Sequence, residues 1–474
     1  MNMNGENNEI IFIRAWHNTY PDNIIPPLGI GSIISYVKER MAGLGFKVFD
    51  QAIDKDVYGN VVRYLGDRRP LLFGISAMVC HYKEAIELSK FLKLRYPEVP
   101  VAIGGPLVRF INYADVMMKG DIDFAIIGEG EKPILSLINY LLYGGCISDI
   151  KGIVYREGDE IHLNQLEEPL KPDEIPFPDY EDINLKEYFN FQGFQWLGER
   201  PYLPLFTSRG CPYRCAYCHN QFGRKVRYME LDKLLKSAGI LIKKYGIDEV
   251  EIIDDIFNIN EDRAMNIIRT LKGYNNKLRF SFPNGLRSDI MSEKFIDFLG
   301  NENAIFISIA IESASERIQK LINKNLDLQK AKYNTNLLAR YGIILNGYFM
   351  IGFPTETFDE MITTVNFARQ LPLHMASFFK VTIYQGTDLY NMLDKEQQEL
   401  INRTEPTDLR YYGKHLNFSN VSDTMLDLIQ KYALICFYFR PWQVYKFIRE
   451  HPKPYLIFKG SKHLIKLFSS KFRL

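Results

Sequence analysis

The sequence lacks several features that would point to common protein classes. Only six cysteines occur in 474 residues, and three of them lie between positions 211 and 218. So few cysteines do not make a disulfide framework, and thiols grouped in this way favour a reducing compartment. The formal net charge is only +1, so no overall field recruits nucleic acid or an anionic surface, and no nucleic-acid partner is expected.

Long apolar segments are also missing. No run reaches the roughly 18 to 20 uninterrupted apolar residues of a membrane-spanning helix, and the densest run, Tyr432–Phe439, is too short. The N-terminus is polar and acidic, so we expect no signal peptide. These absences favour a cytoplasmic protein. A chain of 474 residues that is 46% hydrophobic is long enough for two or three domains.

The three clustered cysteines carry the strongest signal in the chain. Residues 208–218 read S-R-G-C-P-Y-R-C-A-Y-C, which gives Cys211, Cys215 and Cys218 a C-x3-C-x2-C spacing. This spacing can place three thiolates around one face of a cubane iron–sulfur cluster, whose ordinary sites have four cysteines. One iron is then left without a cysteine from this loop, and an open iron can bind a substrate or a cofactor.

Two other kinds of site use clustered cysteines. Zinc usually takes four ligands with paired C-x2-C spacing, and no second Cys or His pair follows at a fitting distance. His219 is adjacent to Cys218 and badly placed to close the same metal. A non-catalytic iron–sulfur protein closed by Cys436 is the second alternative, although Cys436 lies in an apolar run where a free cysteine is usually part of the core.

Two stretches of the chain alternate short apolar runs with amphipathic ones, which predicts an α/β protein with parallel sheets. In residues 10–143 we expect strands at Ile10–Arg14, Phe46–Asp50, Leu71–Ser76, Val101–Gly105 and Asp123–Gly128, and helices at Ile30–Ala42, Lys83–Tyr96 and Lys132–Leu142. In residues 201–390 we expect strands at Leu203–Ser208, Glu249–Ile253, Leu278–Phe282, Ala304–Ile311, Leu345–Ile351 and Ser377–Ile383, with helices such as Leu231–Tyr245 and Glu261–Tyr274. Ligands of such sheets lie beyond the carboxyl ends of the strands.

The cysteine spacing, the leading S-R-G-C-P and the aromatic Tyr217 resemble the radical S-adenosylmethionine (SAM) superfamily. The resemblance implies a 4Fe-4S cluster on Cys211, Cys215 and Cys218 with SAM on the open iron. It also implies an external electron donor such as flavodoxin or ferredoxin, and reductive cleavage of SAM to a 5′-deoxyadenosyl radical. The implied fold is a partial (β/α)6 TIM-like barrel, here over residues 201–390.

The same resemblance implies SAM-binding residues at the ends of the later strands. Asp254 and Asp255 take the place of the family's Gly-Gly-Glu motif, and their alternative role is an N-cap before Glu261. Glu312 lies in a segment like the family's Gly-x-Glu-Ser, with Ala310 in place of the glycine. The other implied contacts are Tyr217, Asn284, Arg287 and Gly352.

Two residues near the later strands have alternative roles. The loop that starts at Gly352 resembles the family's adenine-contacting loop, and Thr355 within it is expected to cap the next helix. Tyr384 follows the sixth predicted strand and is a candidate catalytic group, for which packing at an interface is the alternative.

Residues 1–145 resemble the cobalamin-binding domains attached to radical SAM enzymes, which are Rossmann-like and flavodoxin-like. The resemblance is carried by four segments: Pro26-Pro27-Leu28-Gly29, Gly74-Ile75-Ser76, Ile103-Gly104-Gly105-Pro106 and Ile127-Gly128-Glu129-Gly130-Glu131. It implies cobalamin against Ser76, Gly104, Gly105, Gly128, Glu129 and Gly130. The Asp-x-His-x-x-Gly motif, whose histidine ligates cobalt in some cobalamin domains, is absent around His17 and His81. A purely structural Rossmann-like domain is the alternative.

The remaining segments have other compositions. Residues 146–200 predict a small hairpin at Gly152–Leu163 and a proline-rich linker at Pro172–Asp179. Residues 391–474 predict a helical, basic C-terminal region with helices at Asp423–Phe439 and Pro441–Glu450. From His451 onward six Lys or Arg residues meet no Asp or Glu. This tail is either a solvated basic segment or a weak contact with a membrane surface.

The domain order predicts a cobalamin-dependent radical SAM enzyme that acts on a small-molecule substrate. We expect C-methylation of a biosynthetic intermediate, and cyclisation or rearrangement stays open because the substrate contacts cannot be identified. A methylthiotransferase that acts on tRNA is discounted, because a second cluster needs three more cysteines upstream and only Cys80 and Cys146 lie there.

Overall fold

The computed structural model describes residues 8–17, 24–191, 193, 198–405, 415–440, 445 and 448–449. The chain divides into two compact units. The first comprises Met1–Tyr188, His219–Gly223 and Tyr384–Lys414, and the second comprises Phe189–Cys218, Arg224–Ile383 and His415–Leu474. Most of the predicted helix Pro441–Glu450 and the whole tail from His451 lie outside the described residues.

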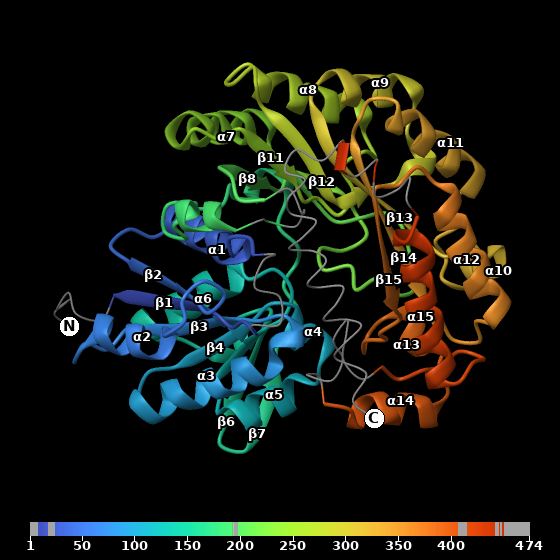
Figure 1. The fold of residues 1–474 in the computed structure, drawn as a ribbon. Coiled ribbons are helices and arrows are strands. Elements are labelled where there is room, and N and C mark those ends of the chain that lie inside the picture. Colours follow the sequence, from blue (N-terminus) through green and yellow to red (C-terminus); the bar gives the residue numbers. More distant parts are fainter. Residues whose placement is uncertain are drawn as a thin grey trace. The chain divides into compact units, whose positions relative to one another are not determined.

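A seven-stranded sheet forms the centre of the first unit, in the order β2-β1-β3-β4-β5-β6-β7 (Figure 1). Five parallel strands come first: β1 (Glu9–Arg14), β2 (Gly45–Asp50), β3 (Leu72–Ser76), β4 (Val101–Gly104) and β5 (Phe124–Ile126). The order 2-1-3-4-5 is that of flavodoxin-like folds, which confirms the predicted fold. The predicted hairpin is β6 (Ile153–Glu157) and β7 (Glu160–Leu163), which pairs with β5 and extends this sheet.

Helices connect the parallel strands and cover the sheet. They are α1 (Leu28–Lys38), α2 (Val57–Leu65), α3 (Tyr82–Arg95), α4 (Pro106–Phe110), α5 (Tyr113–Gly120) and α6 (Glu131–Tyr143). Consecutive residues Ile10 and Ile11 are both wholly buried, as expected of a parallel strand with cover on both faces. The predicted α1, α3 and α6 are confirmed. The sequence prediction missed α2, α4 and α5, which are short.

The second unit contains a six-stranded parallel sheet whose strands follow one another in chain order. They are β8 (Tyr202–Leu205), β11 (Glu249–Ile252), β12 (Arg279–Leu286), β13 (Ala304–Glu312), β14 (Ile344–Ile351) and β15 (Met375–Lys380). All six predicted strands are confirmed. Within the part of the chain that the structure describes, β8 and β15 do not pair with each other, so the barrel is partial. Two short strands, β9 (Ser208–Arg209) and β10 (Arg227–Tyr228), flank the cysteine loop.

The helices of this sheet are α7 (Leu231–Tyr245), α8 (Glu261–Lys272), α9 (Glu293–Asn301), α10 (Glu316–Leu321), α11 (Leu328–Ala339) and α12 (Phe358–Gln370). Short 3-10 helices occur at Val79–His81, Ile147–Asp149, Pro172–Glu174, Leu185–Asn190 and Ser288–Ile290. In the C-terminal region, α13 (Asp388–Asn391) and α14 (Lys395–Arg403) belong to the first unit.

The helix α15 (Asp423–Tyr438) belongs to the second unit and confirms the predicted helix there. It packs on β15 and α12, and an apolar cluster joins its Leu426 and Ile429 to Ile351 of β14 and Met361 of α12. None of the helices in the described ranges has the length and apolar content needed to cross a bilayer.

A buried ionic group lies next to the first two barrel strands. Arg200 donates to both Glu249 and Glu251, and the Arg200–Glu251 bond is 2.7 Å long. Ser281 donates to Glu249 at 2.7 Å. Both glutamates are wholly buried, and they alternate with apolar residues so that they share one side of β11. Removing one member of such a group leaves a buried charge without compensation and typically costs about 3–5 kcal/mol.

The chain that follows β3 and the chain that follows β4 approach each other closely at Gly105. Gly105 has φ +92° and ψ −173°, and a Cβ atom there would lie 2.8 Å from the Ala77 carbonyl oxygen. Backbone in this region is essentially confined to glycine, so Gly105→Ala should lower the free energy of unfolding by ~2 kcal/mol. Gly104→Ala is the matched control, because its Cβ would meet nothing closer than 3.7 Å. Equal urea-unfolding curves for both variants would contradict this account.

Candidate functional site

The cobalamin candidates of the first unit meet at one edge of its sheet. Ser76 ends β3, Gly104 ends β4, and Gly105 is the N-cap of α4. After β5 come Gly128, Glu129 and Gly130, and Gly130 is the N-cap of α6. This edge includes the carboxyl ends of β1 and β3, where the direction of the strand order reverses and ligands of flavodoxin-like sheets bind. The structure therefore brings together all six predicted residues at the carboxyl edge.

The sequence prediction missed a polar group at the same edge. The backbone N–H of His17 donates to Nδ1 of His81 at 2.9 Å, and the rings of Trp16 and His81 lie 4.5 Å apart. The His17 ring contacts Glu84. Both histidines follow strands at the point where the strand order reverses, and this position in the sequence is a signal for a role at the edge. The sequence prediction uses them only to show that the cobalt-ligating motif is absent. His81 uses Nδ1 as an acceptor, so it holds the loop after β1 in place.

The cysteine loop of the second unit lies between β9 and β10. Cys211, Cys215 and Cys218 are half-buried. Burial raises the pKa of the Cys211 thiol to about 11, and the nearby Cys218, Asp255 and Cys215 add to this shift. Their mutual influence shows that the three thiols lie near one another.

The donor set of this loop fits a cluster better than a single zinc ion. In the described part of the chain, no three His, Cys, Asp or Glu side chains could hold one metal ion together. A cubane cluster binds each cysteine on a different iron, so its thiols surround a volume and need not converge on a point. His219, the candidate fourth zinc ligand, packs against Phe110 at 5.2 Å and Tyr384 at 6.4 Å between ring centroids.

The two aspartates after β11 hold the chain that leads into the cysteine loop. The buried Asp254 accepts hydrogen bonds from the Thr207 N–H (2.6 Å), the Thr207 hydroxyl (2.6 Å) and the Ser208 hydroxyl (2.5 Å). Burial raises its pKa to about 6, and the hydrogen bonds from Ser208 and Thr207 oppose that shift. Asp255 accepts from the Gly210 N–H at 3.0 Å, directly before Cys211, and its side chain is exposed.

Glu312 and Tyr217 form a buried polar group together with Lys324. The Tyr217 hydroxyl donates to Glu312 at 3.1 Å, and the Lys324 ammonium donates to Glu312 at 3.1 Å and to Tyr217 at 3.3 Å. Burial, followed by the Glu312 charge, holds the pKa of Tyr217 well above its usual range. Glu312 has φ +66°, an unusual backbone for this residue type and one that clusters at functional sites. The sequence prediction missed Lys324, which occupies a loop after α10.

The predicted residues Asn284, within β12, and Arg287, directly after it, contact neighbouring segments. The Arg287 guanidinium lies 3.8 Å from the Tyr213 ring centre and pairs with Asp289 at 2.9 Å. It also donates to the Lys324 carbonyl at 3.0 Å. Asn284 donates to the Ile253 carbonyl at 2.6 Å. The strand end therefore ties the cysteine loop to the segment that carries Lys324.

The loop after β14 is held by a carboxyl group that the sequence prediction did not identify. Glu356 is wholly buried, and its Oε2 accepts from the N–H groups of Gly352 (2.7 Å) and Phe353 (3.0 Å). Burial raises the pKa of Glu356 to about 8. Gly352 has φ +88°, and the Phe353 ring lies 6.2 Å from that of Tyr217.

Two predicted helix caps are wrong. The N-cap of α8 is Asn260, which accepts from the Arg263 N–H at 3.0 Å, because Asp254 and Asp255 are used by the cysteine loop. The N-cap of α12 is Thr357, which forms a capping box with Glu360. Thr355, the predicted cap, has φ +63°, which is not an N-cap conformation.

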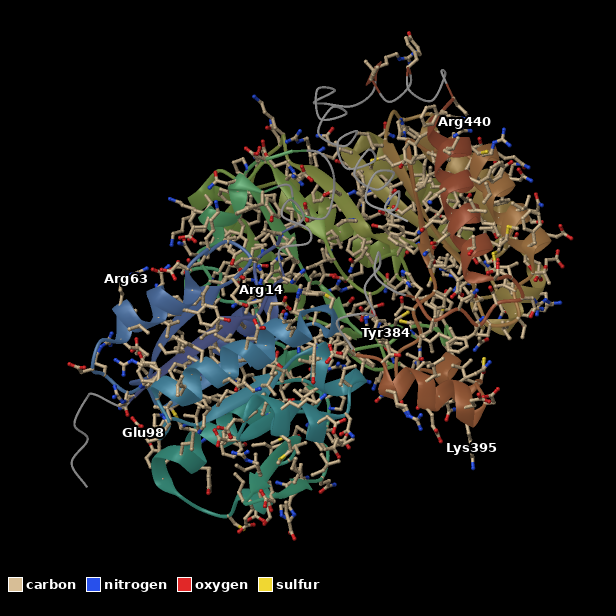
Figure 2. All side chains as sticks on the ribbon, turned by 60° about the horizontal axis from the view of Figure 1, so that its bottom comes forward. Arg14, Arg63, Glu98, Tyr384, Lys395 and Arg440 are labelled. Carbon is tan, nitrogen blue, oxygen red and sulfur yellow. The ribbon has the colours of Figure 1, made fainter. Side chains whose placement is uncertain are left out.

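Two further candidates lie on other elements. Tyr384, labelled in Figure 2, follows β15 and belongs to the first unit. It lines a small cavity with residues of α5 and α14. Cys436, the candidate fourth cluster ligand, lies on α15 and contacts Tyr432.

Comparison with protein families agrees with this arrangement. Residues 205–368 match the radical SAM superfamily, and residues 19–138 match the B12 binding domain. The chain is a radical SAM enzyme with an N-terminal B12 binding domain. The first match runs from the last residue of β8 through the cysteine loop into α12, and the second contains the six cobalamin candidates of the first unit.

Two relatives and one solved structure resemble the chain over most of its length. It is 29% identical over 448 residues to the uncharacterized methyltransferase PH0819 of Pyrococcus horikoshii, which covers 94% of both chains. It is 28% identical to the cytidylyl-2-hydroxyethylphosphonate methyltransferase of Streptomyces wedmorensis, which covers 77% of both. The cobalamin-dependent S-adenosylmethionine radical enzyme OxsB shares the fold with a TM-score of 0.75 at 18% identity, over 98% of this chain and 72% of that one.

The buried Glu356 predicts a specific pH dependence of stability. The unfolded chain loses this proton above its ordinary pKa of 4.5, whereas the folded chain keeps it up to about 8. The stability that Glu356 contributes is therefore complete below pH 4.5 and is lost as the pH rises to 8. Glu356→Gln keeps an acceptor for the two N–H groups and should flatten this part of the profile. Asp359→Asn, an exposed carboxyl on α12, is the control. Parallel wild-type and Glu356→Gln profiles of urea midpoint against pH would refute the assignment.

Proposed function

We propose that this enzyme transfers a methyl group to a carbon atom of a small-molecule substrate with the help of cobalamin and SAM. The observation that carries the proposal is the three-cysteine loop, held by buried side chains from several strand ends, in a chain that also contains a B12 binding domain. Both relatives described above are named as methyltransferases, which supports this reaction class.

The residues that would hold the cluster are Cys211, Cys215 and Cys218. A 4Fe-4S cluster bound there supplies one electron of low potential, received from an external donor such as flavodoxin or ferredoxin, for cleavage of SAM. The chain itself keeps the loop in shape. Asp254 fixes Thr207 and Ser208, while Asp255 fixes Gly210.

Asp255 is the best candidate for the SAM ammonium group. Its side chain is exposed directly beside the cysteine loop, whereas the oxygens of Asp254 are buried and already accept three hydrogen bonds. Glu312, Lys324 and Tyr217 form the next charged group, which would orient the amino acid part of SAM. The flat adenine ring of SAM would lie against the backbone of the loop that starts at Gly352, because this glycine has positive φ and carries no side chain.

The residues that would hold cobalamin lie on the carboxyl edge of the first sheet. A Cβ atom at Gly128 would meet nothing within 4 Å, so the backbone at this glycine is open to a bulky ligand. Bound cobalamin supplies the methyl carrier that radical chemistry at carbon needs. Ser76, Gly104, Gly105, Glu129 and Gly130 would line its binding surface.

Loss of a cluster cysteine tests the proposal. Anaerobically reconstituted wild-type protein with dithionite and SAM should form 5′-deoxyadenosine. Cys215→Ala should lower this to the non-enzymatic background, because only two thiolates of the loop remain. Cys436→Ala is the control and should retain full activity, since Cys436 lies on α15 beside Tyr432. No 5′-deoxyadenosine from wild type with an intact cluster would reject the proposal.

The role of Asp255 can be measured separately. Asp255→Asn should weaken SAM binding about tenfold, the value of a lost charge-assisted hydrogen bond of ~1.5 kcal/mol. The iron content should not change. Asp262→Asn, an exposed carboxyl on α8, is the control. An unchanged dissociation constant for SAM in Asp255→Asn, measured by equilibrium dialysis, would remove Asp255 from the site.

A further inference from the structure

The sequence around the cysteine loop is basic in a chain that is nearly neutral as a whole. From Arg200 to Met229 there are six Arg or Lys residues and no Asp or Glu, although the formal net charge of the chain is only +1. A second segment without acidic residues, Arg317–Leu326, contains three more Arg or Lys residues. Positive charge is therefore concentrated in two segments that are far apart in the sequence.

The fold holds these two segments against each other. The Ala216 N–H donates to the Ile322 carbonyl at 2.8 Å, and the Asn323 side-chain amide donates to the Arg214 carbonyl at 3.0 Å. Ile322 and Asn323 directly follow α10, whose last turn contains Lys320. The cysteine loop therefore rests on the basic end of α10.

The chain that leaves the cysteine loop brings in a further basic pair. The Arg224 guanidinium donates to the Tyr213 carbonyl, and Lys225 is the next residue. Lys225 lies just before β10, which pairs with β9 at the start of the loop. Basic residues from three places in the sequence thus lie around the same loop.

Three of these cations are exposed and are not neutralised. We call them the basic rim: Arg214, Lys225 and Lys320. Within the described part of the second unit, none of the three forms an ion pair. The buried Lys324 differs, because it pairs with Glu312.

Exposed acidic residues near the loop have other roles or other positions. Asp255 is the candidate for the SAM ammonium group. Glu316 and Asp327 bound the second basic segment on its two sides, and Asp327 caps α11. The rim therefore remains a positively charged surface beside the cysteines.

We propose that the basic rim is the docking surface for an acidic electron-carrier protein. The inference rests on the proposed function, in which an external donor supplies one electron for the cleavage of SAM. The reduced carrier would lose one electron and the cluster would gain it, with no bond formed or broken. Because electron transfer between proteins slows steeply with distance, the carrier has to dock close to the cluster. Arg214 directly precedes Cys215, so the rim meets this requirement.

Charge explains why an acidic carrier fits this surface better than other partners. Opposite charges steer two proteins together and raise their association rate. A second copy of the chain would instead bring the same unneutralised cations together. A nucleic acid generally needs more phosphate contacts than three exposed cations provide.

Stopped-flow reduction of the reconstituted full chain tests the proposal. Reduced flavodoxin is the acidic protein donor, and photoreduced 5-deazariboflavin is a small uncharged donor for reference. Lys225→Glu/Lys320→Glu should lower the second-order rate constant with flavodoxin about tenfold at low salt, and added salt should narrow this difference. The rate with deazariboflavin should not change, because both side chains are exposed and neither holds the cluster.

A matched control makes the same two charge reversals elsewhere in the second unit. Lys243→Glu/Lys277→Glu changes exposed residues that lie shortly before β11 and β12, at the amino ends of these strands, whereas the cysteine loop follows the carboxyl end of β8. Flavodoxin should reduce this variant at the wild-type rate.

Three results would overturn the docking surface. They are a wild type that flavodoxin does not reduce, equal flavodoxin rates in the rim and control variants, and a rim variant that is equally slow with deazariboflavin. A wild type that binds no iron on reconstitution would reject the proposed function itself and this inference with it. Iron content therefore distinguishes the two failures.

Discussion

The structure around the cysteine loop depends on two carboxyl groups, the buried Asp254 and the exposed Asp255, which accept hydrogen bonds from the chain that leads into the loop. Asp254 alone accepts three bonds from Thr207 and Ser208, and Asp255 accepts one from Gly210. Burying a carboxyl group is costly unless such bonds compensate it. Both aspartates follow β11, and their hydrogen bonds fix the chain from Thr207 to Gly210, directly before Cys211.

Charged groups inside the second unit have a related role. Glu312 and Lys324 neutralise each other beside Tyr217, and Arg200 lies between Glu249 and Glu251 near the start of the barrel. Buried ion pairs add little net stability compared with apolar packing, but they are sensitive to any change of position. We interpret them as groups that hold strand ends in register. The Glu312 group also contacts Tyr217 of the cysteine loop, so it is close enough to take part in the proposed binding of SAM.

Much of the fold could be predicted because it depends on local patterns. Strand–helix alternation predicted both sheets, and the C-x3-C-x2-C spacing predicted a cluster-binding loop after the first strand of the second sheet. The pairing of the β6–β7 hairpin with β5 was not predictable, because the alternation of a short strand does not identify its neighbour. The short helices α2, α4 and α5 were missed for lack of a sustained period.

The partners of the site residues were harder to predict than the residues themselves. Lys324 lies 107 residues after Tyr217, and Glu356 resembles a solvated residue in a loop. Only the folded chain shows that both are buried. The sequence predicts both aspartates as SAM ligands, but the hydrogen bonds that Asp254 accepts make it a support of the chain before the loop, and Asp255 stays exposed. The alternative caps at Asp254 and Thr355 are not formed, because Asn260 and Thr357 lie directly before α8 and α12 and cap them.

The central claim is that the cluster held by this loop has one iron without a protein ligand. Electron paramagnetic resonance of the reduced, reconstituted protein measures this directly. The account predicts that SAM changes the signal of the 4Fe-4S cluster, because the open iron gains ligands. A signal that SAM leaves unchanged, in protein with full iron content, would show that the cluster is already closed and would contradict the account.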